Sequence, residues 1–167
     1  MNLYIVRHAI AIAQGTPGYE EDSQRPLTDA GRKKMKRIVK GLCELGIELD
    51  SIVTSPYIRA KDTAMILAKE FNMQDKVVLS DSLIPPGNFE TLIQEVREKY
   101  DVENLAIVGH EPMLSSLVSW LTTGNTAMKI VFKKGGVAYL STDNLYGEGR
   151  ATLQWLLTPS LLVKISK

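Results

Sequence analysis

Two short stretches of the sequence decide the fold: residues 3–8 read LYIVRH, and residues 105–110 read LAIVGH. Each begins with an apolar run and ends in a histidine, and the chain contains two histidines in all. A short apolar run bounded by polar residues is typical of a strand that is buried on both faces. We therefore predict two buried strands, each followed at once by a histidine.

The sequence around these strands alternates between strand-like and helix-like patterns over its first 120 residues. Further short apolar runs predict strands at 51–54 and 77–79. Amphipathic spacing predicts helices after Thr28, after Pro56, after Asn88 and from Met113 onward, with Thr28 and Asn88 as N-caps and Gly46 ending the first. Such alternation predicts a parallel sheet with helices on both faces.

Beyond Gly124 the pattern changes to strands alone. We predict strands at 130–132, 136–141 and 152–157, with Pro159 closing the last, and expect them to add antiparallel edges to the sheet. The predicted fold is α/β, a three-layer α/β/α sandwich with a mostly parallel sheet. The length and the absence of a linker predict a single domain over residues 1–167.

Composition excludes several classes of protein. Cys43 is the one cysteine, which excludes an internal disulfide and a cysteine-based metal cluster. The formal net charge of +1 favours neither nucleic acid nor an acidic tail. No apolar run approaches the ~20 residues that span a bilayer, and the first residues lack the features of a signal peptide. We expect a cytoplasmic monomer that binds neither nucleic acid nor membrane.

One helix face is strongly basic, with Arg32, Lys33, Lys34, Lys36, Arg37 and Lys40 in nine positions. The apolar stripe between them faces the core, so we interpret the basic residues as a solvated face. The alternative is a docking surface for an acidic protein or for nucleic acid. No interleaved aromatic residues support nucleic acid.

Polar side chains follow three of the predicted parallel strands: Arg7-His8, the segment 55–60 with Arg59, and Gly109-His110. Ligands of open α/β sheets bind beyond the carboxyl ends of the strands. Arg7 needs an anionic partner beside a buried strand, either a structural carboxylate or a ligand. Arg59 opposes the dipole at the start of a helix. Together these groups predict a phosphate pocket, and no Cys or carboxylate at ligand spacing supports a metal.

These motifs resemble those of the histidine phosphatase superfamily, which has the phosphoglycerate-mutase-like fold. The matching residues are Arg7-His8, Ser55-Pro56-x-x-Arg59-Ala60-x-x-Thr63 and Gly109-His110, in that order along the chain. Within the superfamily, the short chain, Arg25-Pro26-Leu27-Thr28 with Gly31, and Gly109-His110-Glu111-Pro112 resemble the SixA-type phosphohistidine phosphatases. Ala9 stands where the superfamily usually has glycine. A backbone angle that needs glycine would be strained there, but alanine has the smallest side chain with a Cβ atom and we expect it to be tolerated.

The resemblance implies that His8 is the nucleophile and carries a phosphohistidine intermediate. It implies that Arg7, Arg59 and His110 bind the transferring phosphoryl oxygens, and that Arg25 is a further anion-binding candidate. Two guanidinium groups clamp a dianion, and an imidazolium at His110 would add a third positive contact. No metal or other cofactor is then required.

Two carboxyl groups are candidate proton donors, Glu111 beside His110 and Asp81 after the third strand; Glu111 could instead cap the helix that follows it. An imidazole leaving group needs such a donor less than an alkoxide does. The expected function is therefore a metal-independent phosphatase that acts on phosphohistidine in a protein, such as a histidine phosphotransfer domain or a phosphocarrier. The alternatives are a phosphatase of small phosphate esters with the same mechanism and a non-catalytic phosphate- or phosphohistidine-binding module.

Overall fold

The two strands that are each followed by a histidine are neighbours in the middle of the sheet. In the computed structural model, which describes residues 1–143, 145 and 148–166, β1 (Asn2–Arg7) pairs in parallel with β4 (Asn104–Gly109). The remaining strands are β2 (Ser51–Thr54), β3 (Val77–Leu79), β5 (Val137–Ser141) and β6 (Thr152–Leu157). The sheet has the order β3-β2-β4-β1-β5-β6. β2 and β3 extend it in parallel, and β5 and β6 are antiparallel, as predicted.

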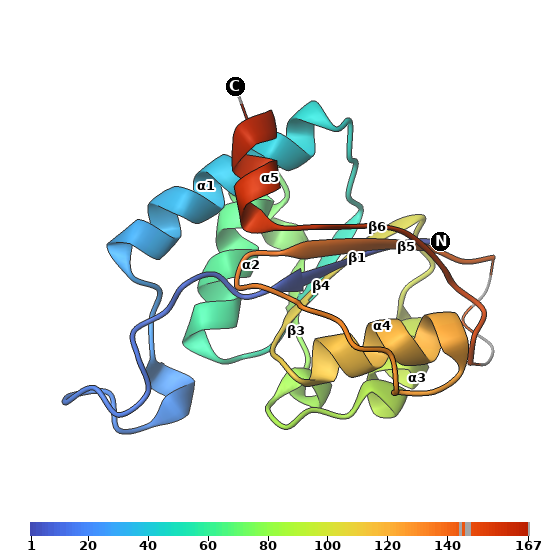
Figure 1. The fold of residues 1–167 in the computed structure, drawn as a ribbon, viewed down its shortest axis with the longest axis horizontal. Coiled ribbons are helices and arrows are strands. Elements are labelled where there is room, and N and C mark those ends of the chain that lie inside the picture. Colours follow the sequence, from blue (N-terminus) through green and yellow to red (C-terminus); the bar gives the residue numbers. More distant parts are fainter. Residues whose placement is uncertain (144, 146–147, 167) are drawn as a thin grey trace.

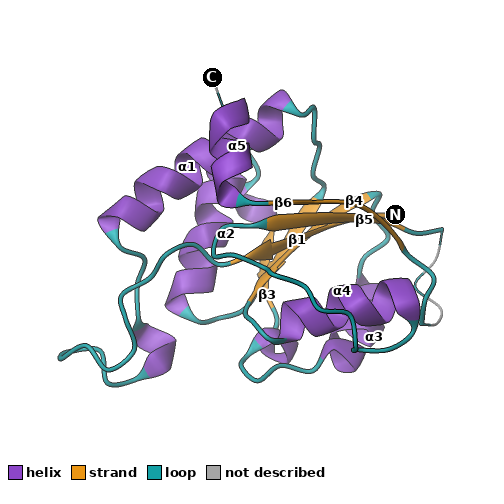
Figure 2. Ribbon diagram, in the orientation of Figure 1, coloured by secondary structure: helices purple, strands orange, loops and turns teal. Residues whose placement is uncertain are grey.

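Helices cover both faces of the sheet, which confirms the predicted three-layer α/β arrangement (Figures 1 and 2). The helices are α1 (Asp29–Glu44), α2 (Ile58–Glu70), α3 (Phe89–Lys99), α4 (Met113–Thr123) and α5 (Pro159–Ile165). α1, α2 and α5 lie over one face, and α3 and α4 lie over the other. Parallel strands need crossover helices to connect them, and this requirement places helices on both faces.

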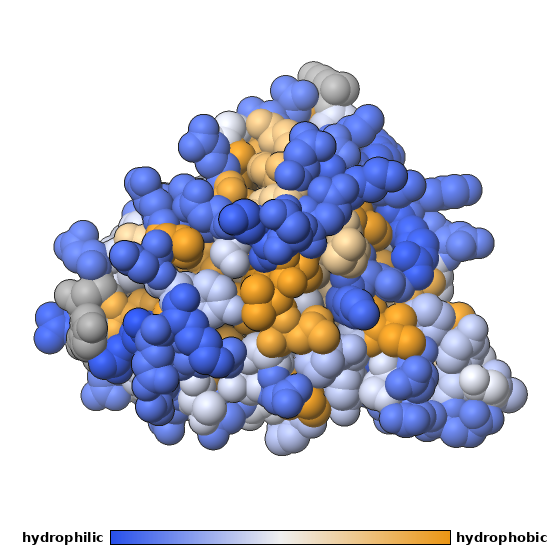
Figure 3. All heavy atoms as spheres, turned by 180° about the vertical axis from the view of Figure 1, so that it is seen from behind, coloured by the Kyte–Doolittle hydropathy of each residue, from blue (hydrophilic) through white to orange (hydrophobic). Residues whose placement is uncertain are grey.

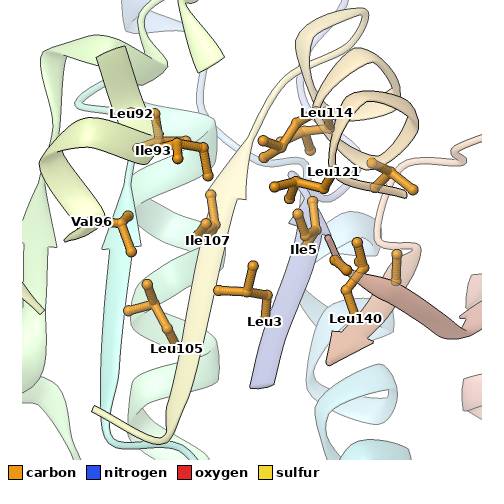
Figure 4. Close-up of a cluster of buried hydrophobic side chains, with 14 of the residues drawn as sticks. Leu3, Ile5, Leu92, Ile93, Val96, Leu105, Ile107, Leu114, Leu121 and Leu140 are labelled. Atoms are coloured by element: carbon orange, nitrogen blue, oxygen red, sulfur yellow. The ribbon is translucent and has the colours of Figure 1, made fainter. Parts of the chain in front are cut away.

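The alternation of side chains along each strand divides the core into two layers. Leu3 and Ile5 of β1 pack into the layer under α3 and α4, whereas Tyr4 and Val6 pack into the layer under α1, α2 and α5. β4 divides its side chains in the same way, with Leu105 and Ile107 beside Leu3 and Ile5 (Figure 4). Both strands are buried on both faces, so their sequences are continuously apolar rather than alternating.

The helix boundaries follow the capping residues. The Thr28 side chain accepts a hydrogen bond from the Gly31 amide, and the Asn88 side chain accepts one from the Thr91 amide. Both N-caps were predicted from the sequence. Gly46, beyond the end of α1, has a φ of 70°, the left-handed conformation in which glycine commonly ends a helix.

α5 was not predicted, because we interpreted Pro159 as closing β6. Pro159 instead occupies the first turn of a helix, where its missing amide costs no hydrogen bond. α5 packs on α1, and a Cβ atom at Gly41 of α1 would lie 2.2 Å from the Leu162 carbonyl oxygen. Gly41 therefore permits the close approach of the two helices.

The strand predicted at 130–132 is wrong. This segment has no regular structure, and the position beside β1 on the side away from β4 is occupied by β5. Its apolar character has another origin: Phe132 is buried in the layer under α3 and α4, and Ile130 packs against that layer.

β3 forms one edge of the sheet, and its residues Val78 and Leu79 are exposed. On the face seen from behind, Figure 3 shows apolar atoms at the surface among polar ones. Within the described part of the chain, no helix is long and apolar enough to cross a membrane.

Candidate active site

Strand register brings the two histidines together. Arg7 is paired with Gly109 at the carboxyl ends of β1 and β4, and the His8 amide donates to the Gly109 carbonyl oxygen at 3.0 Å. His8 and His110 therefore leave the sheet side by side, with ring centroids 5.1 Å apart. Both are buried, at 6% and 4% exposure.

β2 brings Arg59 to the same edge of the sheet. The Ser55 amide donates to the Val108 carbonyl oxygen, so the chain after β2 starts next to the end of β4. Arg59 follows in the first turn of α2 and is buried. The Tyr57 ring lies near the Arg59 guanidinium, whose Cζ atom is 5.1 Å from the centroid of the ring. The centroid of the Tyr57 ring is 5.4 Å from the centroid of the His110 ring.

Arg7 is held at the end of β1 by the segment before β5. Its Nη1 donates to the Phe132 carbonyl oxygen at 2.6 Å. Its pKa is lowered by burial, and the Glu111 carboxylate partly opposes that shift. Arg7 therefore has a carbonyl rather than a carboxylate as its direct partner in the described part of the protein.

Several buried polar nitrogen atoms of the cluster lack a hydrogen-bond partner. Among the residues that the structure describes, these are Arg7 Nε, Arg59 Nε and both ring nitrogens of His110. Buried polar groups are nearly always hydrogen-bonded in proteins, and leaving one unpaired is costly. The unpaired atoms belong to three of the residues that were predicted to bind a phosphoryl group. Their arrangement suits an anion that accepts hydrogen bonds from several sides.

Asp22 is a member of the cluster that sequence reasoning missed. Its carboxylate accepts from Arg59 Nη2 at 2.9 Å and from Arg25 Nε at 2.8 Å, and its carbonyl oxygen accepts from Arg59 Nη1 at 2.7 Å. Partial burial acts to raise the pKa of the Asp22 carboxyl, but the hydrogen bonds from both arginines outweigh burial and lower the pKa. The signal in the sequence was an aspartate three residues before Arg25.

Arg25 therefore reaches the cluster through Asp22. Its Nη1 also donates to the Ile12 carbonyl oxygen at 2.6 Å, so most of its hydrogen-bonding capacity is used within the protein. This geometry makes Arg25 a support for Asp22 and Arg59.

The hydrogen bond of His8 decides which ring nitrogen is reactive. His8 Nδ1 lies 2.8 Å from the Ala9 carbonyl oxygen, which can act only as an acceptor. Nδ1 therefore carries the proton, and Nε2 keeps a free lone pair. A neutral imidazole in this tautomer is a nucleophile that needs no prior deprotonation.

The pKa values of both histidines are lowered to about 3. Burial is the main cause for each, and the positive charge of Arg59 contributes to both. Both rings are therefore neutral near pH 7, which differs from the imidazolium expected at His110. A phosphoryl dianion bound between these groups would raise the pKa of His110, because an opposite charge favours the protonated form.

Ala9 causes no strain. Among the described residues other than glycine, Asn72 is the one with a positive φ, so Ala9 has an ordinary backbone conformation. Its amide donates to the Thr63 Oγ1 at 3.0 Å, and that hydroxyl donates to the Arg59 carbonyl oxygen at 2.7 Å. Thr63 therefore fixes the segment after His8 to the first turn of α2.

The two candidate proton donors differ in their position. Glu111 is half-buried and its charge acts on Arg7, but its carboxylate accepts from the Ser115 amide at 2.9 Å and from the Ser115 hydroxyl, which is the helix-capping alternative. Asp81 is exposed and lines a depression of about 500 Å³ together with Ser80 and Glu95. In the described part of the chain, Asp81 forms no hydrogen bond or ion pair with the histidines or arginines of the cluster.

The fold and the cluster define the class of protein. Residues 3–84 match the histidine phosphatase superfamily (branch 1). An uncharacterized protein of Picosynechococcus sp. is 34% identical over 140 residues, which cover 82% of each chain. The chain belongs to the histidine phosphatase superfamily.

Within this superfamily the chain is similar to SixA proteins. Phosphohistidine phosphatase SixA of Escherichia coli is 24% identical over 162 residues, which cover 95% of this chain and 94% of the relative. The solved structure of the protein histidine phosphatase SixA complexed with tungstate has a TM-score of 0.84 at 23% identity, over 97% of this chain and 99% of that one. The whole described fold, including β5, β6 and α5, is thus that of a known structure.

Proposed function

We propose that this chain is a phosphatase that forms a covalent phosphohistidine on His8 and removes phosphoryl groups from phosphohistidine in proteins. The observation that carries the proposal is a neutral nucleophile in a cluster of buried polar nitrogen atoms that lack hydrogen-bond partners. His8 Nε2 has a free lone pair, and Arg7 Nε, Arg59 Nε and the ring of His110 lack partners around it. The similarity to SixA proteins supports the same conclusion.

In the first step, the lone pair of His8 Nε2 attacks phosphorus and a new N–P bond forms. The N–P bond of the substrate breaks, and its electron pair leaves with the substrate imidazole. Arg7, Arg59 and His110 bind the phosphoryl oxygens and neutralise the charge of the transition state. In the second step, water attacks phosphorus, the bond to His8 breaks, its electron pair returns to Nε2, and inorganic phosphate leaves.

The leaving group is proposed from the state of the candidate acids. Both oxygens of Glu111 accept hydrogen bonds from Ser115, and Asp81 lies in a separate depression. An alkoxide has to be protonated as it leaves, whereas an imidazole that carries a proton on its other nitrogen leaves as a neutral molecule. Phosphohistidine therefore suits this site better than an alkyl phosphate ester.

The proposed substrates are phosphohistidine-bearing proteins, such as a histidine phosphotransfer domain or a phosphocarrier. The reaction needs no metal in this scheme, because the guanidinium groups supply the positive charge. His110 becomes protonated when the phosphoryl dianion binds, and it then adds a third positive contact.

The experiment measures phosphate release from a phosphohistidine-bearing phosphocarrier protein in the presence of EDTA. A small aryl phosphate and the His8→Ala variant are tested in parallel. We expect the wild type to dephosphorylate the protein and His8→Ala to be inactive. Cleavage of the aryl phosphate alone would favour a phosphatase of small esters. Absence of turnover on both substrates would favour a binding module, and loss of activity with EDTA would contradict the metal-free scheme.

A further inference from the structure

The segment from Phe132 to Gly135 is fastened to the nucleophile's strand at both ends. The Phe132 carbonyl oxygen accepts from Arg7 Nη1, and the Gly135 amide lies 3.0 Å from the Arg7 carbonyl oxygen and 3.1 Å from that of His8. Gly135 has a φ of 80°, and a Cβ atom there would lie 2.9 Å from Ile38 Cδ1. The backbone of Lys134 is therefore held beside Arg7 and His8.

Lys134 brings a further positive charge to the cluster. Partial burial lowers the pKa of its ammonium group, and the charges of Arg7, Arg25 and Arg59 lower it further. Its own charge in turn contributes to the lowered pKa of His8. In the described part of the protein, Lys134 forms no ion pair with any carboxylate. Positive charges that outnumber the carboxylates beside them indicate that an anion completes the arrangement.

The balance of charges identifies the kind of anion. Arg7, Arg25, Arg59 and Lys134 are positive, the carboxylates of Asp22 and Glu111 are negative, and both histidines are neutral. The cluster therefore carries a net charge of about +2, which matches the −1.5 to −2 of a terminal phosphoryl group near neutral pH. Without Lys134 the net charge would match a monoanion, such as a phosphodiester.

We propose that Lys134 binds the phosphoryl group beside His8 and makes the site selective for a dianionic, terminal phosphoryl group. The reaction that Lys134 would serve is the one given under the proposed function, so the inference rests on that function. The binding of a phosphate anion by Lys134 does not depend on it. Lys134 lies in a segment without regular structure and follows no strand of the parallel part of the sheet. Lys134 therefore adds a contact from outside the parallel strands to those of Arg7, Arg59 and His110.

The test is calorimetric titration of the protein with inorganic phosphate, in which no turnover is needed. The variants are Lys134→Met, Lys134→Arg and the matched control Lys133→Met, whose lysine is also exposed and is the adjacent residue. We expect Lys134→Met to weaken phosphate binding about 10-fold, the loss of one hydrogen bond between charged groups. We expect Lys134→Arg to restore most of the affinity and Lys133→Met to change it less than about 2-fold.

A second measurement separates binding of the dianion from a general effect of charge. Inorganic phosphate is compared with dimethyl phosphate, a phosphodiester monoanion, at about pH 8, where inorganic phosphate is a dianion. The wild type should bind inorganic phosphate more tightly than the diester, and Lys134→Met should lose part of that preference. Equal affinity of Lys134→Met and wild type, or an equal loss in Lys133→Met, would overturn the inference, as would absence of phosphate binding by the wild type. A wild type that binds phosphate in this way but leaves phosphohistidine intact would refute the proposed function alone.

Discussion

The candidate site is built from two regions that are positioned by different means. The inner region contains Arg7, His8, Arg59 and His110, which follow the carboxyl ends of β1, β2 and β4. The outer region contains Asp22 and Lys134, which lie in segments outside the sheet. Strand register fixes the first group, whereas hydrogen bonds to the first group fix the second. The sheet therefore positions the reactive groups, and the segments outside the sheet adjust the charge around those groups.

The largest effect is expected from removing a charge of the inner region. Arg59→Gln keeps much of the side-chain length but loses the guanidinium whose charge acts on both histidines. We expect kcat/KM for phosphohistidine hydrolysis to fall about 10²- to 10³-fold, as for the loss of one donor to a transition-state oxyanion. The control is Arg32→Gln, which removes an arginine paired with Asp62 on the helices and should leave kcat/KM unchanged. Equal losses of kcat/KM in the two variants would contradict the assignment of Arg59, and not Arg32, to the site.

The next effect concerns the acid stability of the inner region. The pKa of His110 is about 3 in the folded protein, and that of an unfolded histidine is about 6.5. The unfolded state therefore binds the proton first, and folding stability falls as the pH decreases from about 6.5 toward 3. Because the His110 ring is buried in its neutral form, the free energy of unfolding should be about 2 kcal/mol lower at pH 5 than at pH 7.

Urea unfolding of wild type and His110→Gln at pH 7 and pH 5 measures this cost. The decrease in the free energy of unfolding between the two pH values should be smaller in His110→Gln by about 2 kcal/mol. Added phosphate should reduce the decrease in the wild type, because the bound anion favours the protonated ring. An identical pH dependence in wild type and variant would show that His110 is not held neutral.

A smaller effect is expected from the outer region. Asp22→Asn keeps the shape of the side chain but removes the negative charge shared by Arg25 and Arg59. We expect kcat to fall about 10-fold, because Arg59 loses its fixed orientation, while inorganic phosphate binds no more weakly than to the wild type. Asp62→Asn, which removes the partner of Arg32, serves as the control and should be silent. A weakened phosphate affinity in Asp22→Asn would argue that Asp22 does more than orient the arginines.

The smallest effect is expected from the basic face of α1. A variant with both Lys33→Gln and Lys36→Gln should keep kcat/KM within about 2-fold of wild type, because these lysines are exposed and belong to neither region of the site. The measurement uses the phosphorylated protein substrate rather than a small ester. A rise of about 10-fold or more in KM, with kcat unchanged, would identify this face as a docking surface for an acidic partner.

The inner region could be predicted from sequence because short apolar runs predict buried strands. Arg7 and His8 follow one such strand and His110 follows another, and parallel strands end at the same edge of the sheet. Asp22 and Lys134 could not be predicted in this way, since their segments have no periodicity that would place them in space. Phe132 shows the same limit: its apolar run predicted a strand, but its side chain fills the core and its carbonyl binds Arg7.

The most direct test is the detection of the covalent intermediate. Wild type is mixed with the phosphohistidine-bearing protein, quenched in alkali within milliseconds to seconds, and analysed by mass spectrometry under conditions that preserve the N–P bond. We predict one phosphoryl group on Nε2 of His8, formed before free phosphate is released and absent from His8→Ala. Release of phosphate without a labelled His8, or a label on His110 in its place, would contradict the account.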